Sequence, residues 1–303
     1  MVTINALACA GLHRLADGEW RLHSRFTQAI NYQHSQGALL TLFRHGKGMG
    51  PAGVLLSGAQ FARVMPVERF TKQGTTLWGQ GVTLRPSRQL HLQVEAGAIA
   101  GLELSSVTHL SGLCGALNHP PGQEPLACAI IAQLERGLQG EQPDWCWLIG
   151  YGPGLTPSGD DILTGIAAVL HATGLFACMP SFLPPADQLA QLTTSVSCSY
   201  LNSARMGEFS TPVLKVIRRL QSGRCPQSAI GRLLAVGHTS GADILLGIAI
   251  AQRWLQGLDS RGMHARSGNH THVYSGCRNG EFFPCGQLIT QNSRRDKLSH
   301  KNA

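Results

Sequence analysis

The sequence has no Cys-x-x-Cys pair, little charge, few aromatic residues and no long uninterrupted apolar run. Its nine cysteines are an odd number without zinc-ligand spacing, so we expect reduced thiols, as in a cytoplasmic protein, and no zinc. Aromatic residues make up 6% and show no stacking pattern, which argues against nucleic-acid binding. The longest weakly polar run, 162–179, is interrupted by Thr164, His171 and Thr173, and we interpret it as a buried helix rather than a membrane span. The segment 6–10 resembles a cleavage site, but no Lys or Arg precedes it, so we expect no signal peptide.

The formal charge of +8 is concentrated at one end of the chain. Residues 261–303 contain seven Lys or Arg against Glu281 and Asp296, which accounts for five of the eight charges. The remaining body is mildly basic, and such a body suits a small anionic substrate better than a nucleic acid. One basic, glycine-rich loop, with His45 and Lys47, precedes Pro51, and its pattern favours a flexible hairpin turn.

Two kinds of pattern divide the chain, and together they predict an α+β protein. Residues 1–115 hold short apolar or alternating runs between glycine turns, which indicate a barrel- or sandwich-like β domain; the clearest are 38–43, 53–57 and 89–94. Residues 116–260 carry helical patterns and form a second, mainly helical domain; the predicted helices are 125–138, 158 onward, 186–205, 212–220, 226–236 and 240–256. We expect the basic tail, 261–303, to be partly disordered, with a hairpin from 271–274 and 281–283.

The most informative stretch lies between Trp145 and Leu170. Its apolar start, 145–149, is typical of a short buried strand. Glycines at 150, 152 and 154, with two prolines, then favour an irregular loop, and Ser158-Gly-Asp-Asp161 opens an apolar helix. A strand, a glycine loop and a helix N-terminus together present backbone N–H groups to an anion.

This stretch has a second copy 82 residues later. Ser158–Ala167 and Ser240–Ala249 share the pattern Ser-Gly-x-Asp-Ile-Leu-x-Gly-Ile-Ala, with eight of ten positions identical. We therefore predict a pseudo-twofold pair of loop–helix units that face a shared cleft. Gly165 and Gly247 occupy matching positions inside the two helices, where glycine costs about 1 kcal/mol relative to alanine, so we expect the helices to touch there.

An alternative needs no function. Ser-x-x-Asp before an apolar run is a capping box, in which the serine caps the helix and the acid reaches back to its N–H. This interpretation covers Ser158 with Asp161 and Ser240 with Asp243, but it leaves out Asp160 and the glycine-rich loop.

The loop cannot be a nucleotide-binding P-loop. The Gly-x4-Gly spacing of 154–159 is present, but Asp160 and Asp161 stand where Lys and Ser or Thr belong, so no nucleotide is expected. What remains is a site for a small anion, or one assisted by Mg²⁺. In it, His238 would be the titratable base and Asp160 would orient an amide nitrogen or bind the metal. We predict Asp160, Asp161 and His238 as catalytic residues, with substrate bound by Gly154, Thr156, Ser158, Gly159, Thr239, Ser240, Gly241 and Asp243.

The motifs Gly154–Asp161 and Gly237–Asp243, with the Ser/Thr-rich stretch between them, resemble the AllH-like family over roughly residues 15–258. The characterised member is a subunit of an oxamate carbamoyltransferase that acts in allantoin degradation. The resemblance implies a hetero-complex with an FdrA-like subunit of acyl-CoA-synthetase type and a third companion. It also implies transfer of a carbamoyl group between oxalurate and phosphate, giving oxamate and carbamoyl phosphate.

Two other functions stay open at the level of sequence. The chain could be a non-catalytic scaffold subunit whose motifs are helix caps, or a lone Mg²⁺-dependent hydrolase of a small amide. The scaffold predicts no binding of oxalurate, oxamate or phosphate, whereas the hydrolase predicts activity without partners that a chelator abolishes.

Overall fold

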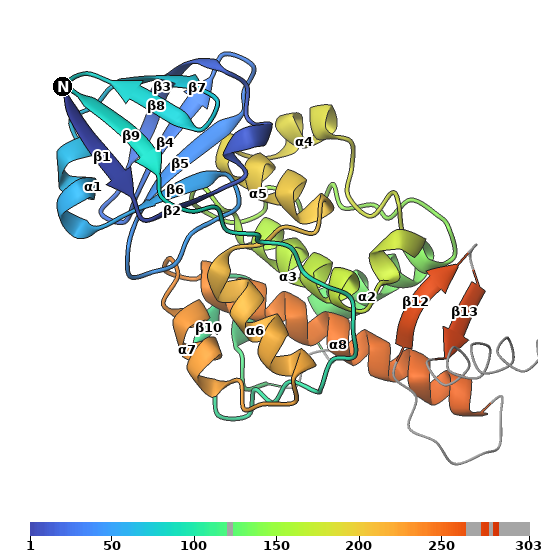
Figure 1. Ribbon diagram of the computed structural model, residues 1–303. Helices are drawn as coiled ribbons and strands as arrows, with labels where there is room; N and C mark the ends of the chain where they lie inside the picture. The colour runs from blue at the N-terminus through green and yellow to red at the C-terminus, as the bar shows by residue number, and fades with distance from the viewer. Residues whose placement is uncertain (120–123, 265–273, 279–280, 285–303) are drawn as a thin grey trace, which may run out of the picture.

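The computed structural model describes residues 1–119, 124–264, 274–278 and 281–284. A sheet of nine strands forms the N-terminal part of the molecule, and a bundle of helices lies beside it (Figure 1). The predicted α+β architecture, with a barrel-like β-rich start and a mainly helical continuation, is confirmed.

The nine strands curl into a nearly closed barrel. Their order is β1-β9-β8-β7-β3-β4-β5-β6-β2, so β1 and β2 form the two edges of the sheet. Only Leu7 separates these strands in the chain, and the two edges are therefore brought together. The strands are β1 Val2–Ala6, β2 Ala8–Ala10, β3 Gly18–Arg25, β4 Ala29–His34, β5 Leu39–Arg44, β6 Gly53–Leu56, β7 Arg69–Gln73, β8 Thr76–Gly79 and β9 Val82–Pro86.

Large side chains fill the barrel interior. Trp20, Ile30 and Tyr32 are fully buried, and Tyr32 packs edge-on against Phe70. The Tyr32 hydroxyl donates a hydrogen bond of 2.9 Å to the carbonyl of Val67, which satisfies its polar atom inside the core. Two short helices accompany the barrel: the 3-10 helix η1 (Leu12–Arg14) and α1 (Gly58–Val64).

The helical part is organised around two central helices, α3 (Ser158–Ala172) and α8 (Ser240–His264). Every residue from Ser158 to Leu170 is buried, so α3 is enclosed on all sides, as an apolar all-round helix must be. The surrounding elements are α2 Pro125–Leu138, η2 Leu175–Cys178, α4 Ala186–Leu192, α5 Ser195–Arg205, α6 Thr211–Gln221 and α7 Gln227–Leu234, with the short hairpin β10 Leu110–Ser111 and β11 Gly115–Ala116.

Three predicted elements are wrong, each because a tertiary contact outweighs the local pattern. The segment 89–94 makes only isolated bridges, because its alternation places Leu92 against the helical core rather than in a sheet. The apolar run 145–149 forms consecutive turns, in which Trp145 is buried against Phe182. The predicted helix 186–205 breaks at Thr193, whose backbone is extended.

The break at Thr193 has a clear local cause. Thr194 is the N-cap of α5, and its hydroxyl accepts a hydrogen bond from the Ser197 backbone N–H at 3.1 Å. The same hydroxyl donates to the carbonyl of Leu155, in the glycine loop. Because Thr194 both caps α5 and holds the glycine loop, two separate helices are more stable here than one continuous helix would be.

A tail hairpin is present, in which β12 (Tyr274–Arg278) and β13 (Glu281–Pro284) pair antiparallel. Its second strand is the predicted one, but its first strand begins only at the end of the predicted 271–274, of which 271–273 lie outside the described residues. The expected disorder near the C-terminus concerns residues outside the described part of the chain.

One cysteine of the described residues departs from the expected reduced state. Cys178 takes part in a disulfide, which corrects the expectation that all thiols are reduced. A disulfide requires two cysteines close in space, and spacing along the sequence does not reveal that.

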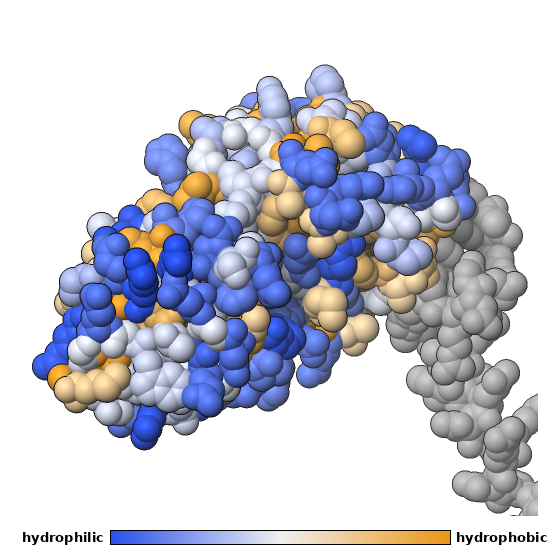
Figure 2. Space-filling view, turned by 90° about the horizontal axis from the view of Figure 1, so that it is seen from above, coloured by the Kyte–Doolittle hydropathy of each residue, from blue (hydrophilic) through white to orange (hydrophobic). Residues whose placement is uncertain are grey.

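Among the described helices, none has both the length and the hydrophobicity needed to cross a bilayer. The face shown in Figure 2 is mostly hydrophilic, with hydrophobic residues in small patches.

Candidate functional site

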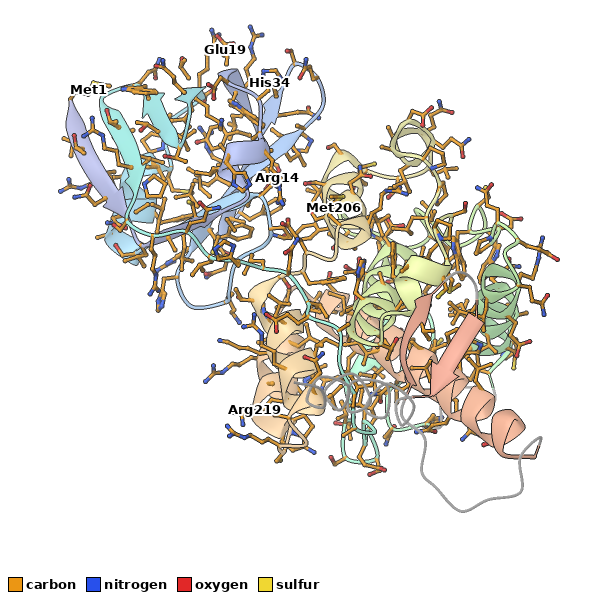
Figure 3. All side chains as sticks on the ribbon, turned by 45° about the vertical axis from the view of Figure 1, so that its right-hand side comes forward. Met1, Arg14, Glu19, His34, Met206 and Arg219 are labelled. Carbon is orange, nitrogen blue, oxygen red and sulfur yellow. The ribbon has the colours of Figure 1, made fainter. Side chains whose placement is uncertain are left out.

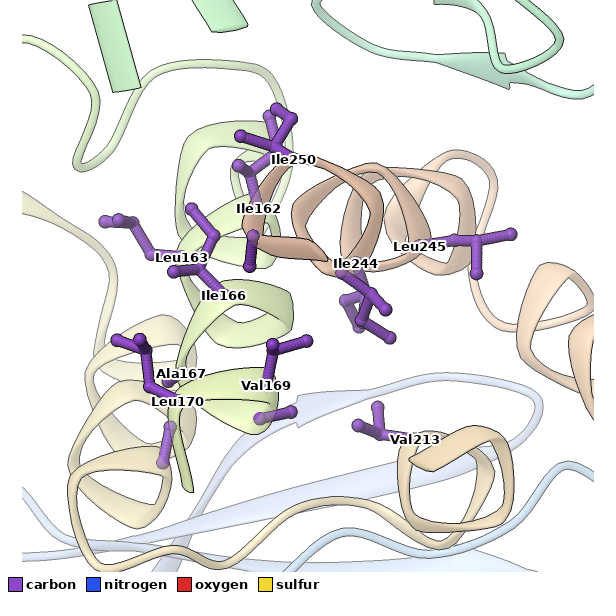
Figure 4. Packing of buried hydrophobic residues seen from close by; sticks show 14 of the residues in the cluster. Ile162, Leu163, Ile166, Ala167, Val169, Leu170, Val213, Ile244, Leu245 and Ile250 are labelled. Carbon is purple, nitrogen blue, oxygen red and sulfur yellow. The ribbon is translucent and has the colours of Figure 1, made fainter. Parts of the chain in front are cut away.

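The two repeat helices cross in direct backbone contact. A Cβ atom placed on Gly165 would lie 2.1 Å from the Ile244 carbonyl oxygen, and one on Gly247 would lie 2.1 Å from that of Ile162. The matched glycines therefore let each helix pass against the backbone of the other, as their positions predicted. Figure 4 shows the apolar side chains that pack around this crossing, from Ile162 to Leu170 on α3 and from Ile244 to Ile250 on α8.

The repeats also agree in local packing. A Cβ atom on Gly159 would lie 1.9 Å from the Leu148 carbonyl oxygen, and the corresponding atom on Gly241 would lie 1.9 Å from that of Leu233. The second glycine of each motif is thus pressed against a carbonyl of the preceding segment in the same way. This equivalence supports the predicted pseudo-twofold relation between the two units.

The two motifs meet at their loops. The hydroxyls of Thr156 and Ser240 are hydrogen-bonded at 2.9 Å, although 84 residues separate them. Ser158 lies next to this contact zone: a Cβ atom on Gly112 would be 2.1 Å from the Ser158 hydroxyl oxygen and 3.3 Å from an Asp243 carboxylate oxygen. The predicted convergence of Thr156, Ser158, Ser240 and Asp243 is therefore observed.

The capping-box interpretation is wrong for the first motif. Pro157 is the N-cap of α3, and no side-chain cap hydrogen bond forms there. In the second motif Ser240 is the first residue of α8, and its hydroxyl pairs with Thr156. The hydroxyls of Thr156 and Ser240 therefore link the two repeats, and Ser158 does not cap α3.

Asp160 fastens the glycine loop to the start of α5. One carboxylate oxygen accepts the Gly150 N–H at 2.9 Å, and the other accepts the hydroxyls of Thr193 at 2.5 Å and Ser197 at 2.6 Å. Asp160 is only 1% exposed, so these three donors compensate the loss of water. The Ser/Thr-rich stretch thus supplies hydrogen-bond donors to the Asp160 carboxylate, and the spacing of the residues did not predict this role.

Asp161 has the most unusual environment in the site. Burial raises the pKa of its carboxyl well above the usual range, and the nearby charges of Asp243 and Asp160 raise it further. The hydroxyls of Ser240 and Thr156 oppose this shift, and one carboxyl oxygen, Oδ2, has no hydrogen-bond partner within the described structure. Asp161 is therefore a protonated acid well above the pH at which an ordinary aspartate ionises.

Asp243 is held by a segment that sequence reasoning missed. Its Oδ1 atom accepts the Ser111 hydroxyl at 2.6 Å and the Gly112 N–H at 2.7 Å, at the tip of the β10–β11 hairpin. Asp243 is fully buried, and its Oδ2 atom lacks a partner among the described atoms. No local signal marks Ser111 and Gly112, because a two-residue strand and a turn look like any loop.

The remaining predicted residues lie around this cluster with little contact to it. His238 and Gly154 are exposed, and Gly154 adopts φ 91°, which favours glycine. The carbonyl of Thr239 accepts the Asp243 N–H at 2.8 Å as part of the first turn of α8. Within the described residues, no group of three or more His, Cys, Asp or Glu side chains is arranged to hold a metal ion.

A groove of about 560 Å³ runs between the barrel and α5. Arg14 from the barrel side and Met206 after α5 lie on its two walls (Figure 3), and the Arg14 guanidinium forms an ion pair with Glu208. Ser195, Ser199 and Ser203 line the groove at intervals of one helical turn. Since α5 also carries Ser197, which binds Asp160, the groove and the carboxylate cluster share one wall helix.

Residues 148–252 match the family model described as oxamate carbamoyltransferase subunit AllH. The match confirms the resemblance drawn from the motifs, and it spans both repeats and the helices between them. No solved structure matches the chain.

Proposed function

We propose that this chain, whose two-repeat segment carries the AllH-family sequence, is a subunit of a carbamoyltransferase that moves a carbamoyl group between oxalurate and phosphate. The observation that carries the proposal is the buried Asp161, whose pKa burial raises and which lies where the two motifs meet within the matched segment. The family description names a subunit, and so the site is expected to work inside a complex. The proposed partners are an FdrA-like subunit and a third companion.

The chemistry requires a proton carrier. In the direction from oxalurate, a phosphate oxygen attacks the carbamoyl carbon, and the bond from that carbon to the oxamate nitrogen breaks. Carbamoyl phosphate and oxamate result, and the proton lost by hydrogen phosphate ends on the oxamate nitrogen. An amide nitrogen leaves poorly without that proton, so a neutral acid at the nitrogen lowers the barrier. Asp161 is the proposed acid, because burial raises the pKa of its carboxyl and so favours the protonated form.

The hydroxyls and N–H groups around Asp161 have proposed roles in substrate binding. Thr156, Ser158 and Ser240 would donate hydrogen bonds to the oxygens of the anionic substrate, and the N-terminus of α3 adds a partial positive charge. Asp160, whose oxygens are filled by internal donors, would position the loop. His238 is exposed before α8, where it can exchange protons with solvent or a partner subunit.

A scaffold role is the second candidate, and the saturation of Asp160 favours it. A carboxylate with three internal donors has little capacity left for a substrate. If the chain only supports a partner's active site, the motifs serve assembly, and Asp161 has no part in turnover.

Reconstitution separates these functions. The chain with an FdrA-like subunit and the third companion is expected to form carbamoyl phosphate from oxalurate and phosphate, whereas the chain alone is not. Calorimetry of the chain alone with oxalurate and oxamate tests whether the site itself binds substrate. Amide hydrolysis by the chain alone, abolished by a chelator, would instead establish the Mg²⁺-dependent hydrolase.

Asp160→Ala is expected to destabilise the chain by about 2–4 kcal/mol, because it leaves one N–H and two hydroxyls without their hydrogen-bond acceptor. Urea denaturation measures the change. Asp187→Ala is the matched control: this exposed acid in the first turn of α4 should cost about 1 kcal/mol or less. Equal, small losses in both variants would contradict the described hydrogen bonds. Normal turnover of an assembled Asp160→Ala complex would remove Asp160 from the mechanism.

A further inference from the structure

A second cavity, of about 500 Å³, lies where the barrel meets α6 and α7, and none of its lining residues belongs to the two motifs. Its walls come from the loop between β5 and β6, from the start of α6 and from the end of α7. Figure 1 shows α6 and α7 side by side below the barrel. A volume of this size holds a small molecule rather than a protein segment.

The barrel loop that forms one wall is fixed in place. The predicted hairpin turn after His45 is wrong, because β5 and β6 run parallel and the loop must cross over between them. Met49 is buried in the helical core, and its backbone exchanges two hydrogen bonds with Thr211: Met49 N–H to the hydroxyl at 3.1 Å, and Thr211 N–H to the Met49 carbonyl at 2.9 Å. A Cβ atom on Gly48 would lie 2.7 Å from the Thr211 hydroxyl, so only glycine allows this approach.

The cavity concentrates positive charge. His45, Lys47, Lys215 and Arg232 line it, and none of the described lining residues is an Asp or Glu. Lys47 donates to the carbonyl of Ala235 at 3.1 Å, which holds its ammonium group at this wall. The ion pairs found among the described residues use other cations, namely Arg14, Arg21, Arg25, Lys72 and Arg136.

Cations that line one cavity repel one another, and a bound anion relieves that repulsion. Lys47, Lys215 and Arg232 bring three formal charges to a cavity that is open to solvent, and the positive end of the α6 dipole, at Thr211, adds to them. Much of the rest of the lining is apolar, with Met49, Leu55, Leu90 and Pro212. Apolar walls beside the cations reduce the water around a bound anion, which strengthens its attraction to them.

We propose that this cavity binds a small anion bearing a phosphate group. Two lysines and an arginine carry enough positive charge to neutralise a phosphate dianion, and a guanidinium fork matches its oxygen geometry. The inference goes beyond the proposed function, since the cavity shares no residue with the two motifs and its binding is measurable without turnover.

Titration calorimetry of the full chain in Hepes buffer at low salt tests this site. Inorganic phosphate and methyl phosphate are the two probes, and each is expected to bind saturably. Tighter binding of inorganic phosphate identifies the free ion as the ligand, and tighter binding of methyl phosphate identifies a phosphate monoester. The double variant Lys215→Gln/Arg232→Gln is expected to weaken both by at least about tenfold, as the loss of two charge-assisted contacts requires.

The matched control is Arg63→Gln/Arg85→Gln, which removes two exposed cations of the barrel that do not line the cavity. It should change the affinity less than about twofold. Equal weakening in the two double variants, or the absence of saturable binding by the unmodified chain, would overturn the proposal. Thermal melts of both variants establish that each is folded before titration.

Discussion

Asp161→Asn is expected to reduce carbamoyl transfer by about 10²–10⁴-fold while making the folded chain more stable at neutral pH. Asparagine keeps the shape of the side chain and a carbonyl oxygen for the hydroxyls of Thr156 and Ser240, but it has no acidic proton to give. The rate is measured in the reconstituted complex as carbamoyl phosphate formed from oxalurate. A loss of rate caused by damage to the fold would go together with a loss of stability, so the opposite signs identify a chemical role.

The stability gain follows from the raised pKa of Asp161. Below about pH 4 the carboxyl is protonated in both the folded and the unfolded chain, and its burial then has no charge-dependent effect on stability. As the pH rises above that value, the unfolded chain ionises first, so stability falls until the folded pKa is reached. Asparagine has no such dependence, and Tm at pH 7 is expected to rise by a few degrees.

Denaturation at pH 4 and pH 7 measures the difference between the two chains. Asp187→Asn, at an exposed site, serves as the control and should show no gain that grows with pH. If the difference in the free energy of unfolding between the unmodified chain and Asp161→Asn were the same at pH 4 and pH 7, the Asp161 carboxyl would ionise as an ordinary aspartate does. Full activity of the Asn variant would favour the scaffold role.

Gly247→Ala is expected to destabilise the helical part strongly, by about 3 kcal/mol or more. The three atoms nearest to the added methyl group are the backbone O, C and Cα of Ile162, the closest at 2.1 Å, so no side chain can rotate away. The two helices must separate, and the motif loops at their ends must move with them. Urea denaturation gives the free energy, and loss of near-ultraviolet circular dichroism reports the loosened core.

Gly231→Ala is the matched control, because it makes the same chemical change in an exposed position of α7. No atom lies within 4 Å of the added methyl group there, so the variant should gain about 0.5–1 kcal/mol from the lower entropy of its unfolded state. If Gly247→Ala also proved neutral or stabilising, the described helix crossing would be incorrect.

The failed predictions share one physical origin. Residues 89–94 alternate and residues 145–149 are apolar, but burial against the helical core produces either pattern without a strand. An apolar pattern predicts which residues are buried, but it does not predict which distant segment of the chain packs over them. The break at Thr193 is similar, because the Leu155 carbonyl that stabilises it is distant in sequence.

The sequence by itself determined the α+β class, the positions of most helices, the repeat and the touching glycines, because these depend on periodicity and on the absence of a side chain at matched positions. Only the tertiary structure decided the chemistry of the site. It brought Thr156 to Ser240, gave Asp243 the Ser111–Gly112 turn as its partner, and buried Asp161, which raises the pKa of its carboxyl. Burial and proximity between distant segments set an acid's pKa, and no local pattern of residues encodes either quantity.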